Sequence, residues 1–366
     1  MQTSPIISTV QYEKVIEYLL ELDNSVPLLV ISESGVGKTY IPQDIAKKKK
    51  IPCIVFNGTG LEPQDLVGMP WIDKTDTTRF RPPFTFSYVK DPASGELKNI
   101  SEYPKGILIL DEVNRLEYQC INTVMQLLDR KTLEEVSIPK GWAIVLTANP
   151  DDEEYQVRSL NKAFRRRCII LEMVSSLTDW RVWAMQNKIH EKIIAVAGRV
   201  ESLRGVKEDG KGEKKIQSNA KQHITRAGMA QVSYLLNNGL DRLDHKLQSA
   251  LIAGLIGPEG AAALMLGIND AELERAVKTL MVGGKIEGKA DFLVEAALLF
   301  IMRIDGQEDK YAEEIYNLYK QAPKDIKPVI FKKFAHKALR AQDGPFFDMS
   351  KDWERWQVDM MTVTGR

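Results

Sequence analysis

Short apolar runs alternate with longer helical patterns over the first half of the chain. The runs are nearly continuous, which is typical of strands buried on both faces of a parallel sheet. They are VPLLVI (26–31), IPCIVFN (51–57), GILIL (106–110), WAIVLT (142–147) and CIILEM (168–173). Segments between them, such as VNRLEYQCINTVMQLLDR, carry apolar residues at helical spacing. The alternation predicts an α/β domain with a doubly wound, five-stranded parallel sheet that ends near residue 174.

Beyond residue 174 helical patterns replace the strand patterns. Residues 176–199 are predicted to be helical, beginning with a cap at Ser176 or Thr178. Residues 291–304 predict a buried or amphipathic helix. The segment 204–222 is charged, contains glycine and has almost no apolar residues, which predicts a loop or linker. The second half is therefore expected to be all-helical.

The most apolar segment, 249–268, contains Pro258 and several glycines. These residues predict two buried helices joined by a turn rather than a membrane span. No basic and then apolar leader opens the sequence, so a cytoplasmic location is expected.

Length and charge narrow the class of protein. A chain of 366 residues is expected to form two or three domains. Its 50 basic and 50 acidic side chains cancel, so no overall field favours nucleic acid or an anionic membrane. The three cysteines are far apart in apolar contexts, which favours reduced core thiols, and the four histidines show no metal-ligand spacing.

The segment SESGVGKTY (32–40) differs at one position from the phosphate-loop pattern G-x-x-x-x-G-K-[ST], because Ser32 stands where the first glycine is usual. The segment follows a predicted strand and precedes a predicted helix, which is the context that such a loop requires. Backbone N–H groups and Lys38 would bind phosphate, and the Thr39 hydroxyl would reach Mg²⁺. A tight turn without ligand is the alternative. Serine suits the first position if its φ is negative there.

Two other strands end on polar residues. GILIL delivers Asp111 and Glu112 at its carboxyl end, where open α/β sheets bind ligands. Asp111 would hold Mg²⁺ and Glu112 would polarise the attacking water, although an acidic pair at a helix start is the alternative. WAIVLT is followed by Asn149, which either holds that water against the γ-phosphate or forms a simple turn before Pro150.

These motifs, with others in the same order, resemble the AAA+ ATPases and within them the MoxR family, closest to the branch with CbbQ, NorQ and GvpN. The resemblance covers roughly residues 10–265. Its strings are SGVGKT, GLEPQDLVGMPWID, TTRFRPPF, GILILDEVNR, QLLDRKTLEEVSIPKGWAIVLTANP, LNKAFRRRCIILEM, DWRVWA, ITRAGMAQVSYLL and LIAGLIGPEGAAAL.

The resemblance implies an AAA+ nucleotide-binding domain over 1–174 and a helical lid over 175–268. Beyond about residue 270 the resemblance weakens, and the helical patterns there predict a helical extension over 269–366. The resemblance implies ATP and Mg²⁺ as cofactors. The implied Walker A segment and nucleotide contacts are Ser32, Glu33, Ser34, Gly35, Val36, Gly37, Lys38, Thr39 and Tyr40.

It also implies roles for residues outside this loop. Asp111 and Glu112 would be Walker B, with Thr39 and Asp111 at the metal, and Asn149 would be sensor 1. The string AFRRRC places Arg167 at the arginine finger that reaches a neighbouring subunit, with Arg166 at the usual Asn position. ITR places Arg226 at sensor 2, although the usual proline is missing.

Residues 72–97 are expected to form an effector surface. The segment mixes arginines with aromatic residues and contains a turn at Pro92–Gly95; its members of interest are Arg79, Phe80, Arg81, Phe84, Phe86 and Tyr88. The resemblance makes it an insert that lines the pore of a ring. Single-stranded nucleic-acid binding and a hairpin with one packed face are alternatives. TLEEVSIPKG (132–141) predicts a hairpin.

The motifs thus predict a Mg²⁺-dependent ATPase, and the resemblance implies that it forms a ring, most simply a hexamer. The resemblance implies a chaperone-like activator of a partner complex, often one with a von Willebrand factor A domain protein. A nucleic-acid motor or restriction-type translocase is the first alternative, and a nucleotide-gated scaffold without useful turnover is the second.

Overall fold

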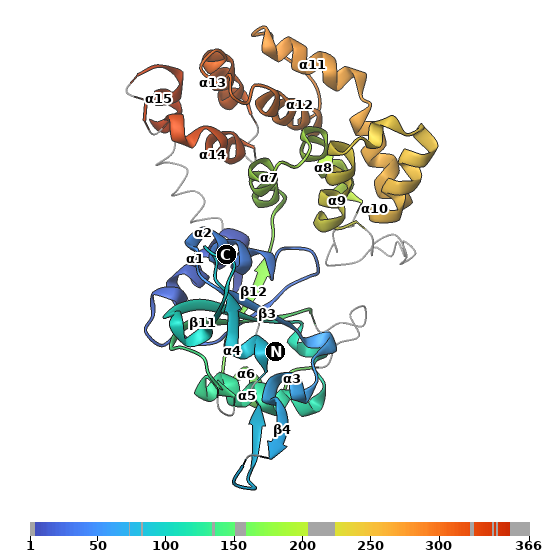
Figure 1. Ribbon diagram of the computed structural model, residues 1–366. Helices are drawn as coiled ribbons and strands as arrows, with labels where there is room; N and C mark the ends of the chain where they lie inside the picture. Colours follow the sequence, from blue (N-terminus) through green and yellow to red (C-terminus); the bar gives the residue numbers. More distant parts are fainter. Residues whose placement is uncertain are drawn as a thin grey trace. The chain divides into compact units, whose positions relative to one another are not determined.

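The computed structural model describes residues 4–72, 74–81, 83–133, 136–150, 159–203, 224–322, 326–338, 340–341 and 343–351. The predicted linker at 204–222 lies outside them. The chain divides into two compact units, Met1–Ser175 and Ser176–Arg366 (Figure 1). Separate lid and extension domains within the second unit stay a prediction.

The first unit is built on a parallel sheet of six strands in the order β1-β12-β2-β11-β8-β3. The strands are β1 (Ile6–Ser8), β2 (Leu28–Ile31), β3 (Cys53–Asn57), β8 (Lys105–Asp111), β11 (Gly141–Ala148) and β12 (Ile169–Val174). Each neighbouring pair is parallel, so the carboxyl ends of all the strands lie at one edge of the sheet.

The predicted doubly wound α/β fold is confirmed, but the sheet has one more strand than the five predicted. The additional strand, β1, has three residues and pairs with β12 from Ile6↔Glu172 to Ser8↔Val174. Its sequence is too short to show a period. Its place at the edge of the sheet is defined by this pairing and by helix α1 (Thr9–Glu21), which Ser8 caps.

Helices and short loops cover both faces of the sheet. The first unit contains α1, α2 (Tyr40–Lys49), α3 (Pro63–Val67), α4 (Phe84–Ser87), α5 (Tyr118–Arg130) and α6 (Lys162–Arg165). Neighbouring residues of β8 face opposite cores: Ile109 packs with α1 and α2, whereas Leu108 packs with α5. This two-sided burial explains why the strands are apolar without alternation.

Three antiparallel hairpins lie outside the main sheet. They pair β4 (Met69–Ile72) with β5 (Thr78–Arg81), β6 (Tyr88–Lys90) with β7 (Leu97–Asn99), and β9 (Thr132–Leu133) with β10 (Val136–Ser137). The third is the hairpin predicted for 132–141. The second closes at the predicted turn, where the Gly95 N–H donates to the Asp91 carbonyl at 2.9 Å.

The described part of the second unit is helical, and one hydrophobic core runs from Trp180 to Met349. Its α-helices are α7 (Leu177–Gln186), α8 (Glu191–Ser202), α9 (Arg226–Asn237), α10 (His245–Ile268), α11 (Ala271–Met281), α12 (Ala290–Arg303), α13 (Ala312–Gln321), α14 (Lys327–Ala338) and α15 (Gly344–Lys351). The helical structure predicted for 176–199 is confirmed. It forms two helices, because the chain breaks between α7 and α8, where Lys188 has φ 57°.

Helix α10 contains the predicted break. Gly257 has φ 76° and ψ 162°, so the residues before and after Pro258 form two helical stretches joined by a kink. By length and composition α10 is the only helix in the described ranges that could span a membrane, and 44% of its most apolar window is buried within the protein. We interpret it as a kinked core helix.

Candidate active site

The phosphate loop joins β2 to α2. Gly35 and Gly37 have φ of 76° and 98°, a region where a side chain is strained. Ser32 is not among the residues with positive φ, and its N–H donates to the Ala148 carbonyl at 3.2 Å. The expected negative φ is confirmed. A serine therefore fits the first position of this loop without backbone strain.

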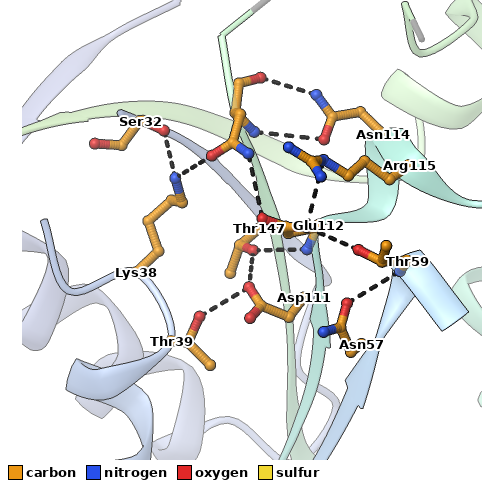
Figure 2. A network of polar contacts seen from close by, with 11 residues as sticks. Ser32, Lys38, Thr39, Asn57, Thr59, Asp111, Glu112, Asn114, Arg115 and Thr147 are labelled. Carbon is orange, nitrogen blue, oxygen red and sulfur yellow. Dashed lines mark hydrogen bonds and ion pairs between the residues drawn. The ribbon is translucent and has the colours of Figure 1, made fainter. Parts of the chain in front are cut away.

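Lys38 is buried, with 7% of its surface exposed, beside the carboxyl ends of β2 and β11. Its ammonium donates to the Ser32 carbonyl (Figure 2), to the Glu33 carbonyl at 2.9 Å and to Asn149 Oδ1 at 2.7 Å. Burial lowers the pKa of Lys38 to about 8, while nearby carboxylates, Asp111 first, oppose that shift. The group is thus a cation surrounded by oxygen atoms, a setting suited to phosphate.

Thr39 and Asp111 form the candidate metal site. The Thr39 Oγ1 hydroxyl donates to Asp111 Oδ1 at 2.8 Å, and the Thr147 hydroxyl donates to the same oxygen. Figure 2 shows these oxygens meeting between the phosphate loop and the end of β8. Hydroxyl and carboxylate oxygens are ligands that Mg²⁺ accepts, so the residues present fit this ion.

Glu112 follows β8 in a left-handed backbone conformation, with φ 54° and ψ 46°. Its N–H donates to Thr147 Oγ1 at 3.0 Å. Its carboxylate accepts from Thr59 Oγ1 at 2.9 Å and from Asn149 Nδ2 at 3.4 Å, and it lies 3.4 Å from Arg115 Nε. A strained backbone for a non-glycine residue is typical of functional sites. The carboxylate is held in place while a quarter of the side chain, 26%, stays exposed.

The loop after β3 approaches Glu112 closely because residue 58 is glycine. A Cβ atom on Gly58 would lie 2.7 Å from the Glu112 carbonyl oxygen and 2.9 Å from that of Asp111. The side chain of Asn57 caps this loop by accepting from the Thr59 N–H at 3.0 Å. Gly58 thus permits the contact between Thr59 and the Glu112 carboxylate.

Asn149, which is 3% exposed, links the two halves of the site. Its Oδ1 accepts from Lys38 and its Nδ2 donates to Glu112. The structure therefore brings together Lys38, Thr39, Asp111, Glu112 and Asn149, which the sequence placed at the ends of three strands and the start of one helix.

The predicted arginines make other contacts. Arg167 follows α6 and donates from Nε to both Asp129 oxygens at 2.8 Å, whereas Arg165 and Arg166 are exposed. Arg226 begins α9 in the second unit and pairs with Glu201 at 2.6 Å. The arginine-finger and sensor-2 roles stay predictions.

One residue of the expected effector surface was wrongly placed. Phe86 is fully buried and stacks on Phe56, with ring centroids 4.3 Å apart, so it belongs to the core beneath the second hairpin. The β4–β5 hairpin is exposed along both strands, and Arg81 lies 5.0 Å from the Trp71 ring centre. Phe80 and Tyr88 are also exposed, whereas the Phe84 side chain lies outside the described parts.

Three further residues of the site, Thr59, Asn114 and Thr147, were not predicted from the sequence. Thr147 could have been found, because it is a polar residue in an otherwise apolar strand and stands two residues before Asn149, which places both on the same side of β11. The structure buries its hydroxyl fully. Thr59 and Asn114 could not have been found in this way, since their contacts depend on how loops fold at the edge of the sheet.

Residues 27–168 match the family model described as AAA domain (dynein-related subfamily). The chain carries an AAA+ ATPase domain. Together with the P-loop fold of the first unit, the match indicates that this domain hydrolyses ATP. The matched range includes the phosphate loop, Asp111–Glu112 and Asn149.

The other comparisons give little further information about this protein. No curated protein matches the chain. The RuvB Holliday junction branch migration motor of Thermotoga maritima is 14% identical with a TM-score of 0.34, and the match covers 92% of this chain and 90% of RuvB. A proposed ATPase of Cytophaga hutchinsonii is 11% identical with a TM-score of 0.33, covering 88% and 80%. TM-scores this low do not establish a common overall architecture.

Proposed function

We propose that this chain is a Mg²⁺-dependent ATPase of the MoxR type that assembles into a ring, most simply a hexamer. The ring would remodel or activate a partner protein complex, in which a protein with a von Willebrand factor A domain is the expected partner. The sequence strings that resemble MoxR proteins support this subfamily and partner. The fold and the AAA-domain match support the ATPase activity.

Hydrolysis would proceed by in-line attack of water on the γ-phosphate. Lys38 would transfer its hydrogen bonds from loop carbonyls to phosphate oxygens. Glu112 would accept the proton of the attacking water, and Asn149 would orient that water through its amide. Mg²⁺, held by Thr39 and Asp111, would supply positive charge against the phosphate oxygens. Arg167 would add charge from the neighbouring subunit, and Arg226 would respond to the γ-phosphate from the same chain.

The observation that carries this proposal is the side-chain amide of Asn149. It accepts from Lys38 at 2.7 Å and donates to Glu112 at 3.4 Å. Lys38, which would bind phosphate, and Glu112, which would activate water, therefore both contact Asn149. A chance turn or a simple helix-start acidic pair would not bring together polar groups from three strand ends.

An affinity pull-down with Glu112→Gln in Mg·ATP tests the proposed role. This substitution keeps the size of the side chain but removes the base, so the ring should hold its partner and mass spectrometry should identify a protein. Glu21→Gln, at the exposed end of α1, is the matched control and should retain no more than the wild type.

Two outcomes would favour the other functions. Recovery of nucleic acid alone, with ATPase activity stimulated by DNA or RNA and sensitive to salt, would favour a nucleic-acid motor. A Glu112→Gln variant with unchanged hydrolysis would favour a nucleotide-gated scaffold.

A further inference from the structure

Asn114 makes an unusual contact with the chain beyond β11. It lies in the short 3₁₀ turn Val113–Arg115, and it is 4% exposed. Its Nδ2 donates to the Asn149 carbonyl at 2.9 Å, and its Oδ1 accepts from the Asn149 N–H at 3.4 Å. One side-chain amide therefore holds both polar groups of one backbone residue.

This contact replaces strand pairing beyond the end of the sheet. The ladder between β8 and β11 runs as far as the pair Leu110↔Leu146. The chain then turns away at Glu112, whose left-handed conformation redirects it into the 3₁₀ turn. Without a neighbouring strand, the Asn149 backbone would lack the pairing that β8 gives to the residues before it. The amide of Asn114 supplies that pairing.

The backbone of Asn149 determines where its side chain stands. That side chain lies between Lys38 and Glu112, at 2.7 Å and 3.4 Å from their polar atoms. A misplacement of about 1 Å at a reacting centre can lower a rate by about 100-fold. Loss of the Asn114 contact should therefore affect hydrolysis more than nucleotide binding.

We propose that Asn114 is a positioning residue for ATP hydrolysis, because it holds the Asn149 backbone and so sets the place of the Asn149 side chain beside Glu112. The inference rests on the proposed ATPase function. It assigns Asn114 no contact with the nucleotide, so its effect must pass through Asn149.

A double-mutant cycle on the full chain tests this dependence. Asn114→Ala should lower kcat about 10- to 100-fold, while the affinity for a fluorescent ATP analogue changes less than about threefold. In an Asn149→Ala background the same substitution should change kcat less than about twofold, since the side chain through which it acts is gone. Asn99→Ala, which removes contacts to Ser101 N and Oγ at 2.9 and 2.7 Å, is the control and should leave kcat unchanged.

A second readout needs neither nucleotide nor turnover. In protein labelled with ¹⁵N-asparagine, the side-chain resonances of Asn149 are identified by their loss in Asn149→Ala. They should shift in Asn114→Ala and stay in place in Asn99→Ala. If Asn114→Ala does not fold, Asn114→Ser keeps a hydroxyl donor at this position and should shift the same resonances in folded protein.

Equal losses of kcat in both backgrounds, or unmoved Asn149 resonances, would overturn the positioning role. A wild-type chain that binds ATP without hydrolysing it would instead overturn the proposed function, while the resonance shift would still report the contact between the two asparagines.

Discussion

Buried and half-buried polar side chains in the two units are arranged in different ways. In the second unit, Arg199 donates to Glu295 at 2.6 Å, and Arg303 binds both oxygens of Glu274 at 2.6 Å. These pairs join α8 to α12 and α11 to α12. In the first unit, the ammonium of Lys38 is surrounded by two backbone carbonyls and the amide oxygen of Asn149.

The difference concerns what each cation can still bind. A bidentate arginine–carboxylate pair satisfies both charges, and the carboxylate of Glu274 raises the pKa of Arg303. Such a pair stabilises the packing of helices. Neutral carbonyl and amide oxygens leave the charge of Lys38 uncompensated by direct contact, and an anionic phosphate would bind it more strongly than they do. We therefore assign stability to the pairs of the second unit and catalysis to the first.

The largest effect in this comparison is expected at Glu112. Glu112→Gln should lower kcat by at least about 100-fold, because an amide cannot accept the proton of the attacking water. Nucleotide affinity should stay within about threefold, a loss too small for removal of a binding group. Steady-state ATPase assays and analogue titrations measure the two quantities. Comparable losses in both would mean that Glu112 serves binding rather than chemistry.

Substitutions in the ion pairs of the second unit should lower its stability rather than the rate of hydrolysis. Arg199→Ala leaves the Glu295 carboxylate, whose side chain is 3% exposed, without its main partner. We expect the free energy of unfolding of this unit to fall by about 2 kcal/mol. Calorimetry of the full chain measures the change. Arg275→Ala, on the exposed side of α11, should change it by less than about 0.5 kcal/mol. A large loss of kcat in Arg199→Ala at low temperature, where the variant is folded, would contradict the assignment of this pair to stability.

The depressed pKa of Lys38 predicts how nucleotide affinity depends on pH. Phosphate favours the protonated ammonium, whose pKa without nucleotide is about 8. Affinity should therefore be complete below pH 8 and fall as pH rises above it, by up to about tenfold per pH unit. Lys38→Arg stays protonated throughout this range and should lose the dependence, even if it binds more weakly. If the affinity of Lys38→Arg fell in the same way above pH 8, the pH dependence would belong to another group.

The smallest effect is expected at Ser32. Its described contacts to Lys38 and Ala148 use backbone atoms, which glycine also has. Ser32→Gly should therefore leave kcat within about threefold, less than about 1 kcal/mol on the barrier. A larger change in an ATPase assay would show that the serine hydroxyl takes part in the site.

The sequence predicted the parts of this molecule that local patterns encode. The five long strands and the polar residues at their ends could be located because burial on both faces gives continuous apolar runs. The kink of α10 was equally visible, since glycine and proline act locally. Edge strand β1 was not, because three residues cannot show a period.

Contacts formed by loops were beyond local patterns. Phe86 was assigned to the surface as a member of the segment 72–97, which mixes arginines with aromatic residues, yet it stacks in the core on Phe56. The contact of Thr59 with Glu112 depends on the close approach of Gly58 to a neighbouring strand. The hydrogen bonds of the Asn114 side chain to the Asn149 backbone depend on the left-handed turn at Glu112. Each is a consequence of tertiary packing rather than of residue spacing.

The identity of the nucleotide held by Glu112→Gln decides whether Glu112 is the catalytic base. The variant is incubated with Mg·ATP, separated from free nucleotide by rapid filtration, denatured and analysed by chromatography. Wild-type protein treated in the same way should retain mainly ADP. Glu112→Gln should retain intact ATP, because Lys38, Thr39 and Asp111 still bind it while the base is absent. Retention of ADP by the variant would contradict the assignment of Glu112 as the catalytic base.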